Sequence, residues 1–186
     1  MASIITATTT SGLTQSADNS GVLQLASGTG NLVTVPSVTG TAMVSGNMPT
    51  FSAYLSSGQT LSANTWTKIT LQTEEWDTAN CFNNSSTYHF TPNVAGYYQV
   101  NGSIRQDSNT NPLGCAIYKN NAVYRYGAQT AVTSGTASLT IALVTSLVYM
   151  NGTTDYIALW GYSQAGGALD TTSTSTYMNA SLVRSA

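Results

Sequence analysis

The alternation of apolar and polar residues over residues 96–106 is the clearest structural signal in this sequence. Even positions such as Tyr98 and Val100 are apolar or small there, whereas the odd positions are polar apart from the amphipathic Tyr97. A period of two places all the even side chains on one face of a β-strand. The pattern therefore predicts a strand with one buried face and one face in water, preceded by a turn at residues 93–96.

Further strand signals follow one another through the rest of the chain, and no segment shows the 3.6-residue apolar period of a helix over helical length. A tight hairpin is expected at Asn120 and Asn121, because asparagine tolerates the left-handed backbone region that such a turn requires. The predicted strands cover residues 51–56, 66–72, 87–91, 96–106, 114–118, 122–126, 137–150, 155–162 and 176–184. This pattern predicts an all-β domain.

Neither face of the predicted strand 137–150 is strongly polar. One face would carry Leu139, Ile141, Leu143, Leu147 and Tyr149, and the other face would carry Thr140, Ala142, Val144, Ser146 and Val148. The outer face of a single sandwich should be in water, so a strand that is apolar on both sides is covered by other elements or by another subunit. We expect association between copies of the chain.

Residues 1–49 differ in composition from the remainder of the chain, with Thr, Ser, Gly and Asn throughout and Asp18 as the sole charged residue. Two alternating runs, 22–25 and 32–35, predict a hairpin. A lone hairpin is marginally stable in water, so this arm should need a partner surface or other copies of itself. The alternative is a flexible low-complexity arm. We expect residues 1–49 to serve attachment and trimerisation and residues 50–186 to form the globular domain.

Charged residues make up 6% of the chain, against roughly 25% in an average globular protein. With a net charge of -2 and five Lys and Arg residues, the chain has no basic patch for a phosphate backbone, so we expect no nucleic-acid partner. No apolar run is long enough to span a bilayer, so no membrane partner is expected. Residues 1–5 show no signal-peptide features, so we expect no export by that route.

The residues that could carry catalysis are few. His89 is the single histidine, and a Ser-His-acid arrangement with Asp107 or Asp155 is formally available, but the Gly-x-Ser-x-Gly motif is absent. We interpret His89 as a strand residue at an edge or a subunit contact. No catalytic residues and no cofactor are predicted, and we expect a protein that is not an enzyme.

Glu74, Glu75 and Asp77 form the densest acidic group of the sequence. Such carboxylates could bind calcium or hydrolyse glycosides. Neighbouring residues of a strand point to opposite faces, so a solvated loop is the main interpretation and no metal site is predicted. Cys81 and Cys115 are too few for a disulfide framework, and we interpret them as small core or loop residues, with a bond between them left open.

Aromatic residues offer the most promising contact groups, with 11 tyrosines and three tryptophans. Tyr and Trp provide a large contact area with few rotatable bonds and one polar tip, which suits oligomer interfaces and stacking on sugar rings. We expect core packing to explain most of them, Tyr98 and Trp160 first. The predicted contacts to a neighbouring subunit or a glycan are Tyr97, Tyr124, Tyr126 and Tyr162.

The sequence around the predicted central strand resembles a known family. Phe90 and Pro92 stand two apart before the turn, and Gly96, Tyr98 and Val100 stand two apart after it. This spacing resembles the signature of the C1q-like and tumour-necrosis-factor-like (TNF-like) jelly rolls. The sequence departs from the family at Val100, where the family has a second aromatic residue.

Two later stretches extend the resemblance over roughly residues 51–186. Residues 147–159 resemble the family's strand, Gly-Asp turn and strand, with two threonines inserted between Gly152 and Asp155. The pattern Met-x-Ala-x-Leu at residues 178–182 stands where the family closes with Phe-x-Gly-x-Leu. The resemblance implies a jelly-roll sandwich that forms a homotrimer, in which three copies bury apolar strand faces around an axis.

The segment 12–23 resembles the openings of phage tail-fibre and head-decoration proteins. Together with the low charge, this resemblance predicts a virion structural protein of a bacteriophage, namely a trimeric capsid decoration, fibre or tail-fibre protein. Its arm would bind a capsid or tail protein, and its knob would display a surface for host adhesion. The alternative is a glycan-binding recognition module that is not fixed to a particle.

Overall fold

The chain divides into two compact units, Met1–Thr41 and Ala42–Ala186. In the first unit, β1 (Leu23–Ala26) pairs antiparallel with β2 (Leu32–Val35), which confirms the predicted hairpin. The phage-like segment 12–23 lies outside the described residues except for its last position. The computed structural model describes residues 23–26, 32–35, 43, 45–106, 112–130 and 139–186.

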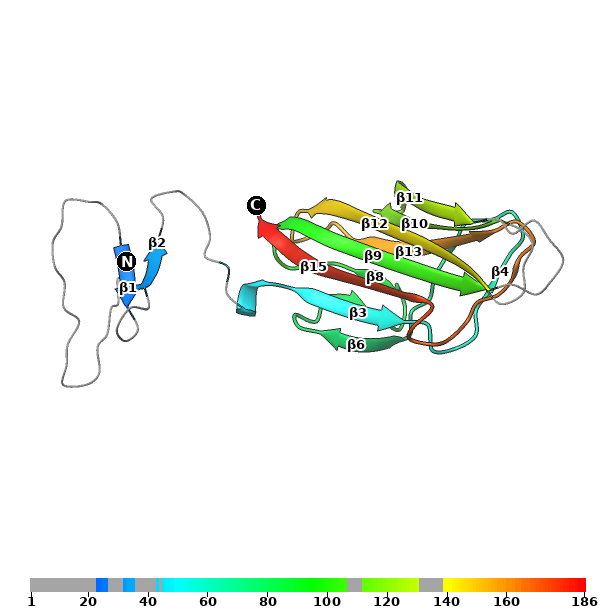
Figure 1. The fold of residues 1–186 in the computed structure, drawn as a ribbon, viewed down its shortest axis with the longest axis horizontal. Coiled ribbons are helices and arrows are strands. Elements are labelled where there is room, and N and C mark those ends of the chain that lie inside the picture. The colour runs from blue at the N-terminus through cyan, green and yellow to red at the C-terminus, as the bar shows by residue number, and fades with distance from the viewer. Residues whose placement is uncertain (1–22, 27–31, 36–42, 44, 107–111, 131–138) are drawn as a thin grey trace. The chain divides into compact units, whose positions relative to one another are not determined.

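Two large antiparallel sheets form most of the second unit, and Figure 1 shows them as stacked layers. The first sheet has the strand order β12-β9-β15-β3-β6. Its strands are β12 (Thr140–Met150), β9 (Gly96–Gln106), β15 (Tyr177–Ser185), β3 (Thr50–Tyr54) and β6 (Thr73–Asp77). An all-β sandwich, as predicted, is therefore confirmed.

The second sheet has the order β11-β10-β13-β8-β7, with β5 paired to β13 beside this path, and β14 pairs with β4 in a small separate sheet. These strands are β11 (Ala122–Thr130), β10 (Leu113–Lys119), β13 (Ile157–Ser163), β8 (His89–Phe90), β7 (Phe82–Asn83), β5 (Thr67–Lys68), β14 (Gly167–Ala168) and β4 (Thr60–Leu61). A short 3-10 turn, Ser45–Asn47, precedes β3. The described residues contain no helix that could cross a bilayer.

The aromatic core joins the two layers. Phe51 of β3 stacks on Phe82 and Phe90 of the facing sheet, with ring centroids 4.8 and 4.4 Å apart. Tyr98 of β9 meets Phe90 edge-on at 5.6 Å and donates its hydroxyl to the carbonyl of Val94 at 2.7 Å. Tyr98 is fully buried, as the even positions of this strand predict, because the hydrogen bond satisfies its polar tip.

Several elements differ from the sequence predictions. The acidic segment predicted as a loop forms the edge strand β6, and only Thr67–Lys68 of the predicted strand 66–72 are in strand β5. Strand β11 continues to Thr130, beyond the predicted end at residue 126. Edge strands carry polar side chains on their exposed sides, so their apolar alternation is weak in the sequence. The start of the predicted strand 137–150 lies outside the described residues.

Candidate functional site: an apolar strand face and an aromatic pocket

Strand β12 exposes large apolar side chains on the outer face of its sheet. Ile141, Leu143, Leu147 and Tyr149 are 44, 55, 50 and 42% exposed, and Thr145 is the polar position between them. The alternate side chains of β12 point into the core. Single exposed apolar residues are ordinary, but here four of the five outward positions of one strand are apolar, in two areas on either side of Thr145.

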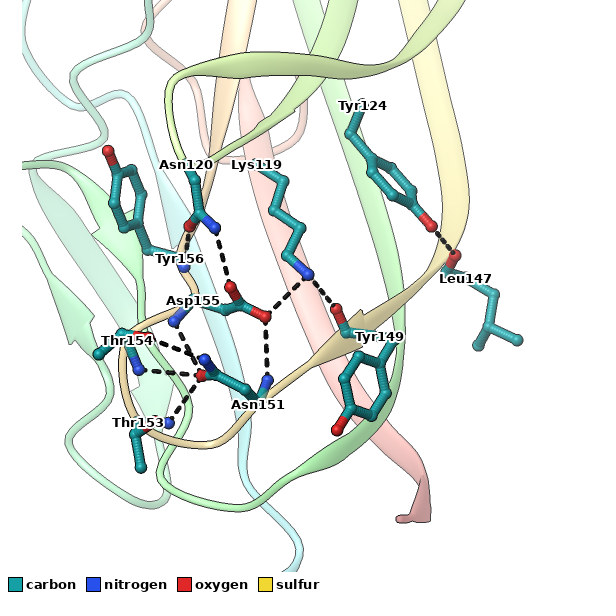
Figure 2. A network of polar contacts seen from close by, with 10 residues as sticks. All are labelled: Lys119, Asn120, Tyr124, Leu147, Tyr149, Asn151, Thr153, Thr154, Asp155 and Tyr156. Atoms are coloured by element: carbon teal, nitrogen blue, oxygen red, sulfur yellow. Dashed lines mark hydrogen bonds and ion pairs between the residues drawn. The ribbon is translucent and has the colours of Figure 1, made fainter.

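The backbone edge of β12 is covered by the facing sheet. Strand β12 is the last strand of its own sheet, so its outward carbonyl groups need partners other than a strand. Side chains of β10 and β11 donate to three of these carbonyls. The bonds are Thr130 Oγ1 to Ile141 (3.0 Å), the Tyr124 hydroxyl to Leu147 (3.2 Å) and Lys119 Nζ to Tyr149 (2.7 Å), the last two drawn in Figure 2.

Close backbone packing covers a fourth carbonyl of the same edge. A Cβ atom at Gly127 of β11 would overlap the carbonyl oxygen of Leu143 and the side chain of Val144. Only glycine allows this approach between the two strands. Hydrogen bonding and packing together cover four outward carbonyls of β12, while its outward side chains stay exposed.

A polar row crosses the middle of the outer face. Thr145 Oγ1 donates to Asn101 Oδ1 at 2.8 Å, and Asn101 Nδ2 donates to Asn179 Oδ1 at 2.9 Å. Gln99 Nε2 donates to Thr145 Oγ1 at 2.8 Å. These bonds fix the orientation of the side chains across β12, β9 and β15. They separate two apolar areas of β12, one on each side of Thr145.

A polar network anchors the β10-β11 hairpin to the loop between β12 and β13, as Figure 2 shows. Lys119 Nζ binds Asp155 Oδ2 at 2.8 Å, and Asn120 Nδ2 donates to Asp155 Oδ1 at 2.8 Å. Asn120 Oδ1 accepts from the backbone amide of Tyr156 at 3.0 Å. Burial acts to raise the pKa of Asp155, but hydrogen bonds from Lys119, Asn120 and the Asn151 amide outweigh it and lower the pKa.

The second candidate site is a pocket of about 320 Å³ on the β11-β10-β13 sheet. The ring of Trp66 lies 5.4 Å from that of Tyr126 and 5.5 Å from that of Tyr162, with tilts of 43° and 37° between ring planes. Gln129 and Gly114 complete its outer wall and floor. The volume lies at the low end of small-molecule pockets.

Gly114 makes room for this pocket. In the sheet register it stands between Gln129 of β11 and Tyr162 of β13, and it faces away from the core. A Cβ atom here would meet the Trp66 ring at 3.5 Å, an ordinary contact distance. The missing side chain lets the Trp66 ring lie over β10, where Gly114 and this ring both line the pocket.

The four tyrosines predicted as contacts fall into two places. Tyr126 and Tyr162 line the aromatic pocket, and Tyr126 is 64% exposed. Tyr97 packs against Tyr149 with ring centroids 5.4 Å apart, and Tyr124 binds the β12 edge. The structure thus brings two of them together with Trp66 and places the other two beside β12. Their functional role stays a prediction.

Sequence reasoning missed Trp66 as a pocket residue and Lys119 as part of the β12 edge. Trp66 precedes a two-residue strand, and nothing near it in the sequence signals a contact with Tyr126. Trp160, predicted in the core, is instead partly buried on the outer face and stacks on Tyr118 at 4.2 Å. The rings can lie there because the neighbouring outward positions of β10 are glycine and alanine.

The remaining reactive groups have structural partners. His89 lies on the internal strand β8 and not at a sheet edge, because β8 pairs with both β7 and β13. Its ring stacks on Tyr156 at 4.4 Å, and burial, aided by the positive charge of Lys68, lowers its pKa. Asp155, the acid considered for a triad, is bound by Lys119. Asp107 lies outside the described residues.

The acidic segment is tied into the sandwich at several points. Glu75 accepts a hydrogen bond from Ser52 at 2.7 Å, and Asp77 accepts from the backbone amides of Ala79 and Phe82 at 3.2 and 2.7 Å. Burial, followed by the charge of Asp77, raises the pKa of Glu74. Over the described part of the chain, no group of three His, Cys, Asp or Glu side chains is arranged to hold a metal ion.

Comparisons with known proteins identify the fold. No protein-family model matches the sequence, and no curated protein matches it. The solved structure of Eiger TNF from S. frugiperda is 12% identical and matches with a TM-score of 0.57 over 75% of this chain and 93% of its own. Murine APRIL, crystallised at pH 5.0, is 7% identical, with a TM-score of 0.58 over 73% of this chain and 99% of its own.

The fold is a TNF-like jelly roll. This result confirms the jelly-roll part of the sequence resemblance, which rested on a few short spacings. At such low identities the likeness establishes the architecture alone. The comparisons give no support to the phage resemblance of residues 12–23, which stays a prediction.

Proposed function

We propose that this chain is a virion structural protein of a bacteriophage that assembles as a homotrimer through the outer face of β12. In this role its TNF-like jelly roll forms a displayed, non-enzymatic knob, and residues 1–49 attach it to a capsid or tail protein. The observation that carries the proposal is the apolar face of Ile141, Leu143, Leu147 and Tyr149, which is exposed in the single chain.

The covered backbone edge of β12 supports association through side chains. An exposed edge would favour the addition of a strand from another chain. Here Thr130, Tyr124 and Lys119 already donate to three of the outward carbonyls, and an added strand would have to displace these bonds. A second copy would therefore meet the apolar side chains, and burying them would provide the driving force for assembly.

The trimer follows from the resemblance to the C1q-like and TNF-like jelly rolls, and the virion role follows from composition. A chain with 6% charged residues and abundant Thr, Ser, Asn and Gly suits a protein that is held permanently in a particle. The resemblance of residues 12–23 to phage fibre and decoration proteins points in the same direction.

The solution mass tests the assembly. Native mass spectrometry of the full chain should give about three times 19.4 kDa. The double variant Leu143→Gln and Leu147→Gln should shift the mass toward one copy, because it makes the outward face polar. Val123→Gln on β11 is the matched control, since Val123 is also an exposed apolar residue, and it should leave the trimer intact. A wild-type protein that stays a monomer would refute the assembly.

The location in a particle needs a separate experiment. Mild dissociation of virions from the source phage, followed by immunodetection of this chain, should place it in the head fraction or the tail fraction. Either fraction supports the virion role and distinguishes decoration from tail fibre. Absence of the chain from purified virions would overturn that role even if the trimer is confirmed.

A further inference from the structure

We propose that the aromatic pocket between Trp66, Tyr126 and Tyr162 is a binding site for a neutral saccharide, with one pyranose ring stacked against the aromatic walls. The site lies on the β11-β10-β13 sheet, and the assembly face lies on the outer side of the other sheet. The inference therefore does not rest on the proposed trimer.

The walls of the pocket match the apolar side of a sugar ring. Trp66 stands between Tyr126 and Tyr162, and its plane is tilted by 43° and 37° from theirs, so three ring surfaces converge on one space. A pyranose presents a face of C–H groups to such surfaces. Aromatic side chains give this contact at low entropic cost because they have only two rotatable bonds.

Polar groups of the pocket match the hydroxyl groups at the edge of the same sugar. Gln129 carries an amide that can both donate and accept, and its side chain is exposed. The hydroxyl of Tyr162 donates to Asn64 Oδ1 at 3.0 Å, which fixes the hydroxyl and leaves its oxygen able to accept from a ligand. These groups would orient a polyol without any ion pair.

Charge argues for a neutral ligand. None of the lining residues, which are Trp66, Gly114, Cys115, Tyr126, Gly127, Gln129 and Tyr162, carries a charge. Acidic sugars and nucleotides would bring a carboxylate or phosphate that is normally bound by Arg or Lys. A nucleobase would in addition stack best between parallel rings, whereas these rings are tilted.

The floor of the pocket sets its size. Gly114 provides the space under the rings, and a methyl group there would meet Trp66 at ordinary contact distance without strain. The variant Gly114→Ala should therefore fold normally and make the pocket shallower. Gly114→Ala therefore reduces the space for the ligand without lowering the stability of the fold, so a loss of binding would come from the pocket alone.

A saccharide-binding measurement tests the site on the full chain. The probes are the methyl glycosides of glucose, galactose and N-acetylglucosamine together with a glycan array of neutral and acidic oligosaccharides. Saturation-transfer NMR should show binding of at least one neutral probe, and the fluorescence of Trp66 should change. Tyr126→Ala and Trp66→Ala should each weaken binding by about tenfold, which corresponds to about 1.4 kcal/mol for the lost aromatic contact.

Controls keep the test decisive if a variant is unstable. Tyr126 is 64% exposed, so Tyr126→Ala should keep the wild-type melting temperature and native mass. Gly114→Ala should weaken binding, whereas Trp76→Ala, which removes an exposed tryptophan of β6, should not. The proposal is overturned if no neutral probe binds, if only acidic ligands bind, or if Tyr126→Ala and Gly114→Ala bind as tightly as the wild type. A monomeric protein that binds the sugar would refute the trimer and keep this site.

Discussion

Gly127 of β11 lies directly against the carbonyl oxygen of Leu143 in β12, where any side chain at position 127 would overlap the backbone. This contact joins the two sheets along one side of the sandwich. Because β11 and β12 belong to different sheets, this close approach helps to close that side, together with the hydrogen bonds of Thr130, Tyr124 and Lys119 to the edge of β12.

The variant Gly127→Ala should lower the free energy of unfolding by about 2 kcal/mol, because the added methyl group forces the two backbones apart. Chemical denaturation measures the loss. Gly58→Ala is the matched control, since a Cβ atom at Gly58 would meet nothing within 4 Å, and its effect should stay within about 0.5 kcal/mol. Equal effects of the two substitutions would contradict the close packing of β11 on β12.

The two asparagines of the β10-β11 turn should respond differently to glycine. Both have positive φ angles, 52° for Asn120 and 64° for Asn121, which glycine adopts without strain. Asn121→Gly should therefore keep or slightly raise the stability. Asn120→Gly should lower it by about 1 kcal/mol, because Asp155 and the Tyr156 amide lose hydrogen bonds. Thermal melts of both variants would reveal the difference, and identical melts would argue against the network of Figure 2.

Asp155 should make the stability depend on pH. Its pKa is lowered in the folded protein, so the carboxylate stabilises the fold above its unfolded pKa of about 4, and this contribution is lost as the pH falls through the lower folded value. Asp155→Asn should therefore be less stable than the wild type at pH 7, with a smaller difference below about pH 4. Urea denaturation of both proteins across this pH range measures the difference in stability. A stability difference between the two proteins that grows as the pH falls would contradict the lowered pKa of Asp155.

The two cysteines should be unreactive in the native protein. Both are free and buried, and burial raises the pKa of Cys81 and raises that of Cys115 to about 12. Because the thiolate is the reactive form, a maleimide at neutral pH should label neither residue until denaturant is added. Ser57→Cys, at an exposed position, provides the reference for rapid labelling. Rapid native labelling of the wild type would show that these thiols are accessible.

The sequence carried enough information for the central strands and the fold class. In β9 the alternation between Tyr98, Val100 and their polar neighbours marks one buried face, because a shift by one residue would expose the whole apolar set. The Asn120-Asn121 turn was predicted for a similar reason, since few residue types adopt positive φ. Local chemistry dictates both features.

The aromatic pocket and the covered edge of β12 depend on contacts that could not be predicted from the sequence. Trp66, Tyr126 and Tyr162 meet only because β5 and β10 both pair with β13 and β11 pairs with β10. The covering of β12 by Lys119 and Tyr124 likewise arises from the packing of two sheets. Such contacts join residues that are distant in the chain, so periodicity along one strand cannot reveal them.

On β12, several backbone carbonyl groups already have partners, whereas the outward side chains are apolar and exposed. This arrangement has a thermodynamic consequence. Association through that face would depend on the release of ordered water and hardly on ionic attraction, because none of its outward side chains is charged. Complexes should then tolerate high ionic strength and loosen on cooling, as contacts driven by water do. Under the proposed function, particles should release this protein at low temperature more readily than at high salt concentration.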